Sequence, residues 1–211
     1  MARKRREAGN LELIGGQLCL DFTNTYTQTE VLHHEYLHHY PDLLAWSRHA
    51  SLLNDDQAQQ LDQKAAANPT RATAVFDRAI VLRGTIYRIF AAVAHQQTPL
   101  PADVAALNAW LAEAPGRPQL VSAGAVFTWQ WRQDASALDT MLWPIAWSAA
   151  DLLTSADLPR VRQCARSDGC DWLFVDTSKN QSRRWCSMNL CGSRDKMRRY
   201  YQRKRGISSK G

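Results

Sequence analysis

The chain has 211 residues and a formal net charge of +6, and 45% of its residues are hydrophobic. This length allows one large domain or a domain with a small module, and the apolar content is sufficient for a substantial core. No run approaches the roughly 20 apolar residues that a membrane-spanning helix needs, and no apolar segment follows the basic start as it would in a secretory signal. We therefore expect a cytoplasmic protein that does not enter the membrane.

The charge is divided unevenly along the chain. Residues 160–211 hold ten Arg and four Lys against four Asp, a net charge of +10, whereas residues 7–159 hold eight Lys and Arg against sixteen Asp and Glu, a net charge of −8. A basic module on an acidic body is typical of a protein with a polyanionic partner. A solvated, solubilising tail is the alternative, but here the positive charge coincides with a cysteine cluster.

The N-terminal segment predicts a tail and then a β-hairpin. Residues 1–10 are basic and are expected to be disordered. In residues 10–25, apolar and polar side chains alternate on either side of a Gly15-Gly16 turn, which predicts the hairpin. Cys19 would then lie on the face opposite Leu18 and its apolar neighbours, as a small buried hydrophobe.

Apolar residues at three- and four-residue spacing predict a series of helices after this hairpin. A short helix follows Pro41, and a polar helix covers residues 55–67. The longest helix covers residues 70–97, with Thr70 as its cap.

The second half of the body adds a hairpin between two helices. A helix is expected over residues 101–115, and residues 119–133 then alternate apolar and polar side chains, which predicts a second β-hairpin. Residues 137–158 return to helical spacing, and Pro144 either kinks this helix or marks a new start. The predicted fold class is α+β, a mostly helical body with two β-hairpins, followed by a small four-cysteine finger made of a hairpin and a basic helix. The body is placed at residues 11–158 and the finger at residues 159–211.

Four of the five cysteines lie in two pairs, Cys164 with Cys170 and Cys186 with Cys191. Between the pairs, residues 172–176 alternate as a strand, and the RRW segment can return after a polar turn, so that a hairpin would bring the four thiols together. In a reducing compartment such a cluster favours a metal over disulfides, and four thiolates form the tetrahedral donor set of structural zinc. An iron–sulfur cluster is the alternative, but the spacings match no ferredoxin pattern.

The segment after Cys191, GSRDKMRRYYQRKRG, predicts a helix capped by Ser193 and ended by Gly206. Its apolar residues Met197, Tyr200 and Tyr201 share one face, which would pack against Trp172 or Trp185. Basic side chains on the remaining faces favour contacts with the phosphates and base edges of DNA, although a solvated terminal helix is the alternative. The predicted nucleic-acid contacts are Arg183, Arg184, Arg194, Lys196, Arg198, Arg199 and Arg203.

Two polar clusters in the body raise other hypotheses. The sequence HEYLH, from His34 to His38, fits the H-E-x-x-H pattern of zinc proteases, with His33 and His39 on either side. It lacks a strong apolar stripe, and we interpret it as a polar loop or a helix end. A second cluster sits at the end of a predicted strand, where it forms either a turn or a small-ligand site. Its members are Asp21, Asn24 and Thr25.

The C-terminal segment closely resembles the CGNR zinc-finger family, whose members are regarded as bacterial stress-induced transcriptional regulators. The matching pieces are Cys164, Cys170, WLF with Asp176 and Ser178, Asn180, RRWCSM at Arg183–Met188, and Cys191-Gly192 followed by Arg194 and Lys196. The resemblance implies that the four cysteines ligate zinc and that the finger binds DNA. Ser193 stands where the family has its name-giving Asn. The preceding region resembles the ABATE domain through LCLDFTNT, DLLAWSRHASLL, LRGTIYRIF and LNAWLA.

Together these features predict a DNA-binding transcriptional regulator that is not an enzyme. Zinc would be its cofactor, and its body would sense a small-molecule effector or form a homodimer. Three alternatives stay open: an RNA-binding zinc protein, an enzymatic or ligand-binding body with the finger as a structural staple, and a module that binds an acidic protein.

Overall fold

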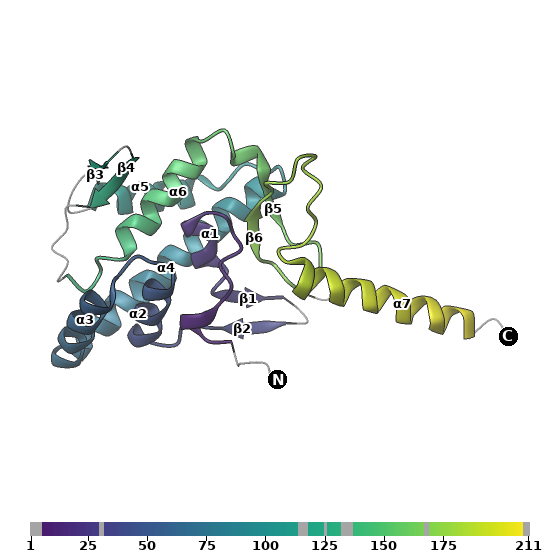
Figure 1. Cartoon of the computed structure of the whole chain (residues 1–211), viewed down its shortest axis with the longest axis horizontal. Coiled ribbons are helices and arrows are strands. Elements are labelled where there is room, and N and C mark those ends of the chain that lie inside the picture. The colour runs from purple at the N-terminus through teal and green to yellow at the C-terminus, as the bar shows by residue number, and fades with distance from the viewer. Residues whose placement is uncertain are drawn as a thin grey trace.

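A computed structural model describes residues 6–29, 32–113, 118–124, 126–131, 137–166 and 169–208. The described chain is mostly helical, with small two-stranded antiparallel sheets, and this confirms the predicted α+β class (Figure 1). The helices are α1 (Leu18–Thr23), α2 (Tyr40–His49), α3 (Asp55–Ala67), α4 (Pro69–Ala94), α5 (Pro101–Glu113), α6 (Leu142–Thr154) and α7 (Ser193–Ser208). The strands are β1 (Tyr26–Gln28), β2 (His33–Glu35), β3 (Pro118–Ala123), β4 (Val126–Trp131), β5 (Val161–Gln163) and β6 (Leu173–Val175). None of the described helices combines the length and apolarity needed to cross a lipid bilayer.

The long helix α4 forms the centre of the body. Its buried residues include Leu82, Ile86 and Ile89, at helical spacing, and α1, α2, α5 and α6 pack around it. Asn68 caps this helix by accepting a hydrogen bond from the backbone N–H of Arg71, so the predicted Thr70 cap is wrong. The side chain of Asn68, two residues earlier, reaches a free N–H group of the first turn.

Pro144 lies in the first turn of α6, which begins at Leu142. Proline is tolerated there because its missing N–H would have no partner within the helix in any case. This resolves the alternative left open by the sequence: Pro144 marks a start rather than a kink.

The first predicted hairpin is wrong, because Leu18–Thr23 forms the helix α1. Four of its six residues are buried, so the segment lacks the polar face that a half-exposed strand would have. Gly15 lies directly against it: a Cβ at this position would stand 2.8 Å from Cβ of Leu20, and its N–H donates to Oδ1 of Asp21 at 2.7 Å. The first hairpin of the body is instead β1–β2, in which Thr27 pairs with His34.

The second predicted hairpin is confirmed as β3–β4, with Leu120 paired to Trp129. The side chains of β4 beyond Val126 lie outside the described residues. At the chain start, residues 1–5 also lie outside the described range. Ala8–Asn10, however, forms a 3-10 turn that packs on α2 with Ala8 buried, so this part of the predicted tail is folded.

The sheet of the finger differs from its prediction. Strand β6 pairs with β5, which precedes the first cysteine, and Val161 lies opposite Val175. The RRW segment forms no strand; it returns beside the first cysteine through one backbone hydrogen bond, from Ala165 N–H to the carbonyl of Arg184. Val161, Leu173 and Val175 are buried in the same apolar core as α4 and α6. The sheet of the finger therefore belongs to the core of the body, whereas the four cysteines form a second buried cluster with Leu11, Trp172 and Phe174.

Helix α7 leaves the finger and extends away from the rest of the molecule (Figure 1). It runs from Ser193 to Ser208, so Gly206 lies inside the helix and the predicted stop at that residue is wrong.

Candidate metal centre and basic helix

The four thiols of Cys164, Cys170, Cys186 and Cys191 come together in one buried cluster, in which all four Sγ atoms lie within 4.8 Å of one another. The sulfurs of Cys170 and Cys186 are 3.7 Å apart, and those of Cys186 and Cys191 are 3.4 Å apart. Four ligands at about 2.3 Å from a tetrahedral zinc have sulfurs about 3.8 Å apart. The donor set and its spacing therefore fit zinc.

Each pair of cysteines comes from a loop that the fold holds in place. Cys164 and Cys170 lie on the loop between β5 and β6, and the backbone N–H of Cys164 donates to the carbonyl of Trp172 at 2.9 Å. Cys186 and Cys191 lie on the approach to α7, and the N–H of Cys186 points to Sγ of Cys164 at 3.4 Å. A backbone N–H aimed at a thiolate stabilises its negative charge.

The four thiols also shift one another's pKa values. The contact with Cys170 lowers the pKa of Cys164, and contacts with Cys164 lower the pKa of Cys191 but raise those of Cys170 and Cys186. Four thiolates at this spacing repel one another, so a divalent cation is what allows all four to ionise. The remaining thiol, Cys19, is fully buried as predicted, and burial raises its pKa to about 12.

Two arginines support the cluster from outside. Arg166 is buried, with Nη1 3.7 Å from Sγ of Cys191 and Nη2 donating to the carbonyl of Gly169 at 3.0 Å. Arg183 lies 4.2 Å from the ring centre of Phe174 and donates to backbone carbonyls on several segments. Those carbonyls belong to Ile14, Val175, Trp185 and Cys186. The guanidinium of Arg183 thus joins the metal loop to the body, and its predicted contact with nucleic acid stays a prediction.

Asp176, a residue of the family pattern, closes the polar loop between the two pairs of cysteines. Its carboxylate accepts hydrogen bonds from the backbone N–H groups of Ser178 and Arg183, both at 2.9 Å. Desolvation opposes ionisation of this buried group, but the hydrogen bonds with Ser178 and Arg183 outweigh it and lower the pKa of Asp176.

The chain enters α7 through a single π-helical turn, Met188–Gly192, which contains the last cysteine. Ser193 does not cap the helix, because its hydroxyl donates to the carbonyl of Met188 at 3.1 Å. In the first turn of α7, Asp195 is buried and pairs with Arg199 at 2.8 Å and with Arg198 at 3.7 Å. The predicted contact of the α7 tyrosines with Trp172 or Trp185 is wrong, since Tyr200 and Tyr201 are each more than half exposed and so is Met197.

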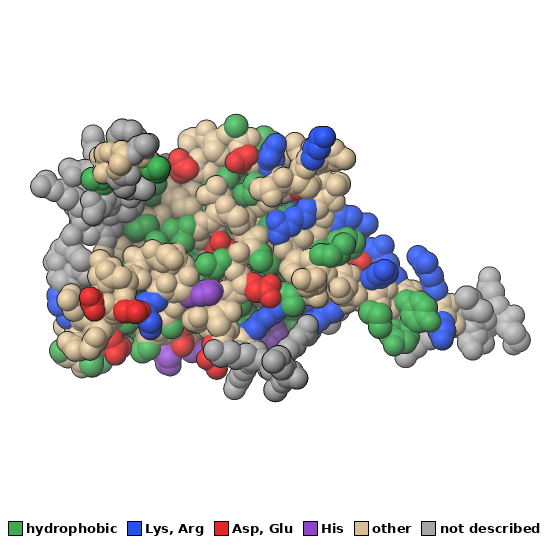
Figure 2. All heavy atoms as spheres, in the orientation of Figure 1, with side chains coloured by type: hydrophobic (Ala, Val, Ile, Leu, Met, Phe, Trp, Pro, Cys, Tyr) green, Lys and Arg blue, Asp and Glu red, His purple; other side chains and the backbone are tan. Residues whose placement is uncertain are grey.

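Basic side chains cover the exposed length of α7. Figure 2 shows them gathered over the finger and α7, whereas the acidic side chains on the same face lie mostly over the body. Arg194, Lys196, Arg203 and Lys204 are exposed, and so is Arg184, which lies over the ring of Trp185 at 5.3 Å. Of the seven predicted nucleic-acid contacts, six are therefore on or beside this surface, and two of these are tied to Asp195.

Comparison with protein families accounts for almost the whole chain. Residues 16–156 match the family named ABATE, whose description reads "Putative stress-induced transcription regulator". The chain belongs to the ABATE family. Residues 160–204 match the CGNR zinc finger, so the buried cysteine cluster and α7 fall within one known module. A search of curated proteins found no match. Zinc is the cofactor indicated by the CGNR match together with the four clustered cysteines.

The histidine-rich segment of the ABATE domain does not have the helical geometry that the H-E-x-x-H pattern requires. His34 and Glu35 lie on the strand β2 and His38 in the loop after it, so H-E-x-x-H is not on a helix. Glu35 forms an ion pair with the buried Arg83, at 2.5 and 2.7 Å. Among the described residues, the four cysteines form the one group of potential ligands close enough to hold a metal ion.

The predicted ligand cluster of the ABATE domain is occupied by the protein itself. Asp21 accepts the N–H of Gly15, and Thr25 accepts Nη1 of Arg83 at 3.0 Å and donates to the carbonyl of Phe22. Asn24 is buried and bonds to both backbone groups of Leu173. A ligand role for these three residues stays a prediction, and their hydrogen bonds give it no support.

The sequence patterns did not single out Arg166 and Asp195 as supports of the CGNR finger. Arg166 is 9% exposed and Asp195 is 1% exposed, and such burial of a charged side chain is visible only in the folded protein. In the sequence, both residues stand among other charged residues and look no different from them.

Proposed function

We propose that this ABATE–CGNR protein is a DNA-binding transcriptional regulator that contacts DNA through α7 and acts without catalysis. The observation that carries the proposal is the position of α7, a basic helix that extends from the buried cysteine cluster with most of its cations exposed. A helix of 16 residues is about 24 Å long, and the major groove, about 12 Å wide, admits one helix.

In this mechanism the zinc-bound cysteines fix the start of α7, and Arg166 and Arg183 hold the metal loops against the body. Lys196, Arg203 and Lys204 would neutralise phosphates, and Arg194 lies where the helix meets the finger. When bound, zinc supplies structural cross-linking of the two cysteine loops. One helix gives a small interface, so useful sequence selectivity requires a homodimer on two half-sites. This role places the protein with the bacterial chromosome, in the cytoplasm.

The test is a titration of fluorescein-labelled duplex DNA with the full zinc-loaded chain, followed by anisotropy at several salt concentrations. A truncated chain without the finger is unsuitable, because removing β6 would also remove part of the core of the body. The double variant Lys196→Gln/Arg203→Gln removes two exposed cations of α7. The control is Lys64→Gln/Arg71→Gln, which removes two cations from α3 and α4.

The wild-type chain is expected to lose affinity steeply with salt. The α7 variant should bind several-fold more weakly, and its plot of log K against log salt should be shallower by about two. The control should bind like the wild type. Equal losses in both variants would show that only overall charge matters, and no binding by the wild type at low salt would refute the proposal. A structured RNA hairpin that displaces the DNA at equal concentration would assign the surface to RNA.

A further inference from the structure

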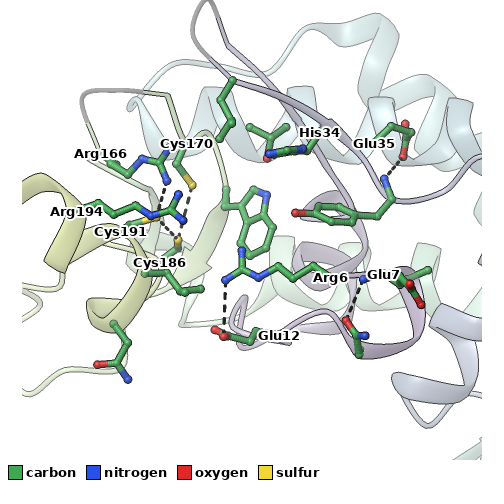
Figure 3. Close-up of a pocket in the computed structure, with 18 of the residues that line it drawn as sticks. Arg6, Glu7, Glu12, His34, Glu35, Arg166, Cys170, Cys186, Cys191 and Arg194 are labelled. Carbon is green, nitrogen blue, oxygen red and sulfur yellow. Dashed lines mark hydrogen bonds and ion pairs between the residues drawn. The ribbon is translucent and has the colours of Figure 1, made fainter. Parts of the chain in front are cut away.

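A large cleft lies between the ABATE domain and the CGNR finger. It has a volume of about 840 Å³, within the range of small-molecule sites. One wall comes from the chain start and the β1–β2 hairpin, through Arg6, His34 and Tyr36. The opposite wall comes from the finger, through Trp172 and Arg194 (Figure 3). The cleft is therefore built by both parts of the protein.

The cations of the cleft face one another across this space. In Figure 3, Arg6 extends from the body side toward the finger, and Arg194 and Arg166 lie together on the finger side. Arg166 is engaged with the sulfur of Cys191 and offsets the charge of the thiolates. Arg194 is exposed, and no ion pair of its side chain is found within the described residues. Within the described part of the chain, Arg6 pairs with Glu12, at 3.8 Å.

Four carboxylates line the cleft, those of Glu7, Glu12, Glu35 and Asp42, and Glu12 lies 3.8 Å from Arg6. Glu35 is paired with Arg83, and Asp42 accepts the backbone N–H groups of His38 and His39 at 2.8 and 3.2 Å. Glu35 and Asp42 are therefore engaged within the protein, whereas Arg194 has no ion pair among the described residues.

The remaining wall of the cleft is aromatic. Trp172 is almost fully buried, and the ring of Tyr36 lies 6.0 Å from that of His34. Guanidinium groups beside aromatic surfaces recognise an anion that carries a planar apolar body. We propose that this cleft binds a small aromatic carboxylate or phosphate ester, with Arg6 and Arg194 holding its anionic group.

Such a ligand would regulate the helix. Arg194 lies in the first turn of α7, three residues after Cys191. The bound anion would therefore pair with a cation at the N-terminal end of the proposed DNA-binding helix. This coupling, unlike the binding of the anion, rests on the proposed function. It predicts that the ligand lowers the affinity for DNA by about fivefold or more.

The first experiment contains no DNA, so its result is independent of DNA binding. The full zinc-loaded chain is titrated with benzoate, phenyl phosphate and the neutral benzamide by isothermal titration calorimetry. The variants are Arg6→Gln and Arg194→Gln. The control is Arg203→Gln, which removes a cation of α7 outside the cleft. Melting curves of all four proteins establish that each is folded.

At least one anion is expected to bind with a Kd below about 1 mM, and benzamide about tenfold more weakly. Each cleft variant should weaken the anion about fivefold or more, and Arg203→Gln should not. The proposal is overturned if neither anion binds at about 10 mM, if benzamide binds equally well, or if the control loses as much as the cleft variants. In the anisotropy titration, a probe that binds the free protein but leaves its affinity for DNA unchanged would overturn the coupling to α7.

Discussion

Asn24 bonds to both backbone groups of Leu173: its amide donates to the carbonyl and its oxygen accepts the N–H, each at 2.9 Å. An asparagine side chain thus takes the place of a neighbouring strand beside β6. The pair joins the end of α1, in the ABATE domain, to the sheet of the CGNR finger, and both residues are buried.

Asn24→Ala is expected to lower the free energy of unfolding by about 2–5 kcal/mol, because it leaves a buried N–H and a buried carbonyl without partners. Asn68→Ala, which removes the exposed cap of α4, should cost about 1 kcal/mol and serves as the control. Urea unfolding measures both. An Asn24→Ala cost no larger than that of the cap would show that the pair contributes little.

Replacing any of the four clustered cysteines by serine should abolish stoichiometric zinc, which mass spectrometry of the metal content measures. The melting temperature should fall by about 10 °C or more, since zinc binding contributes folding energy. Cys19→Ala, at the remaining buried cysteine, should keep one zinc per chain. A Cys186→Ser protein that retains its zinc would refute the four-thiolate site.

Arg183 and Arg203 should separate structure from recognition. Arg183→Gln is expected to cost about 2–4 kcal/mol of stability, because the side chain holds several backbone carbonyls. Arg203→Gln should leave stability unchanged and weaken DNA binding. Paired thermal melts and anisotropy titrations compare the two, and the reverse pattern would contradict the assignment of Arg183 as a support.

Gly169 has a φ of +90°, and a Cβ there would overlap Oγ1 of Thr29 at the end of β1. Gly169→Ala should therefore destabilise the protein more than Gly124→Ala. Gly124 also has a positive φ, +70°, but a Cβ at this position meets no atom within 4 Å. Because the backbone strain is similar, the difference between the two unfolding free energies measures the contact of the finger loop with the β1–β2 hairpin. An equal loss of unfolding free energy in the two variants would show that the finger loop and the hairpin accommodate the added methyl group without cost.

Burial raises the pKa of Asp21 to about 6 against hydrogen bonds from Gly15 and Ile14 that lower it. Between about pH 4 and pH 6 the folded protein therefore binds a proton that the unfolded chain releases, so this group makes stability fall as the pH rises. Asp21→Asn removes the effect. Its free energy of unfolding should match the wild type below pH 4 and exceed it by about 3 kcal/mol above pH 6. Urea titrations from pH 3.5 to 7.5 test this, and a constant difference would contradict it.

Most of the helices could be predicted because their apolar residues recur at three- and four-residue spacing, which distinguishes a helix from a strand. The long stripe of α4 could not be read as anything else. Residues 18–23 were misread as a strand, since a segment buried on most sides shows no polar face by which a period of two is distinguished from 3.6. The cysteine cluster was predictable because four thiols within a short segment have few other uses.

The remaining features depend on contacts across the chain. Strands β5 and β6 pair across the loop that holds Cys164 and Cys170, and no turn motif in the sequence predicts this pairing. Arg183 and Arg203 are alike in sequence, and only the carbonyls around Arg183 show that it belongs to the scaffold. The cleft could not be foreseen, since its two walls come from opposite ends of the chain.

The placement of β6 in the common core also limits how these proteins can exchange parts. A chimaera that joins the finger of one relative to the body of another at residue 159 would set Val175 and Leu173 against an unfamiliar surface. It would also part Leu173 from Asn24. The smallest unit that can be transplanted is α7 with the turn before it, so the proposed DNA specificity is best altered by grafting that segment.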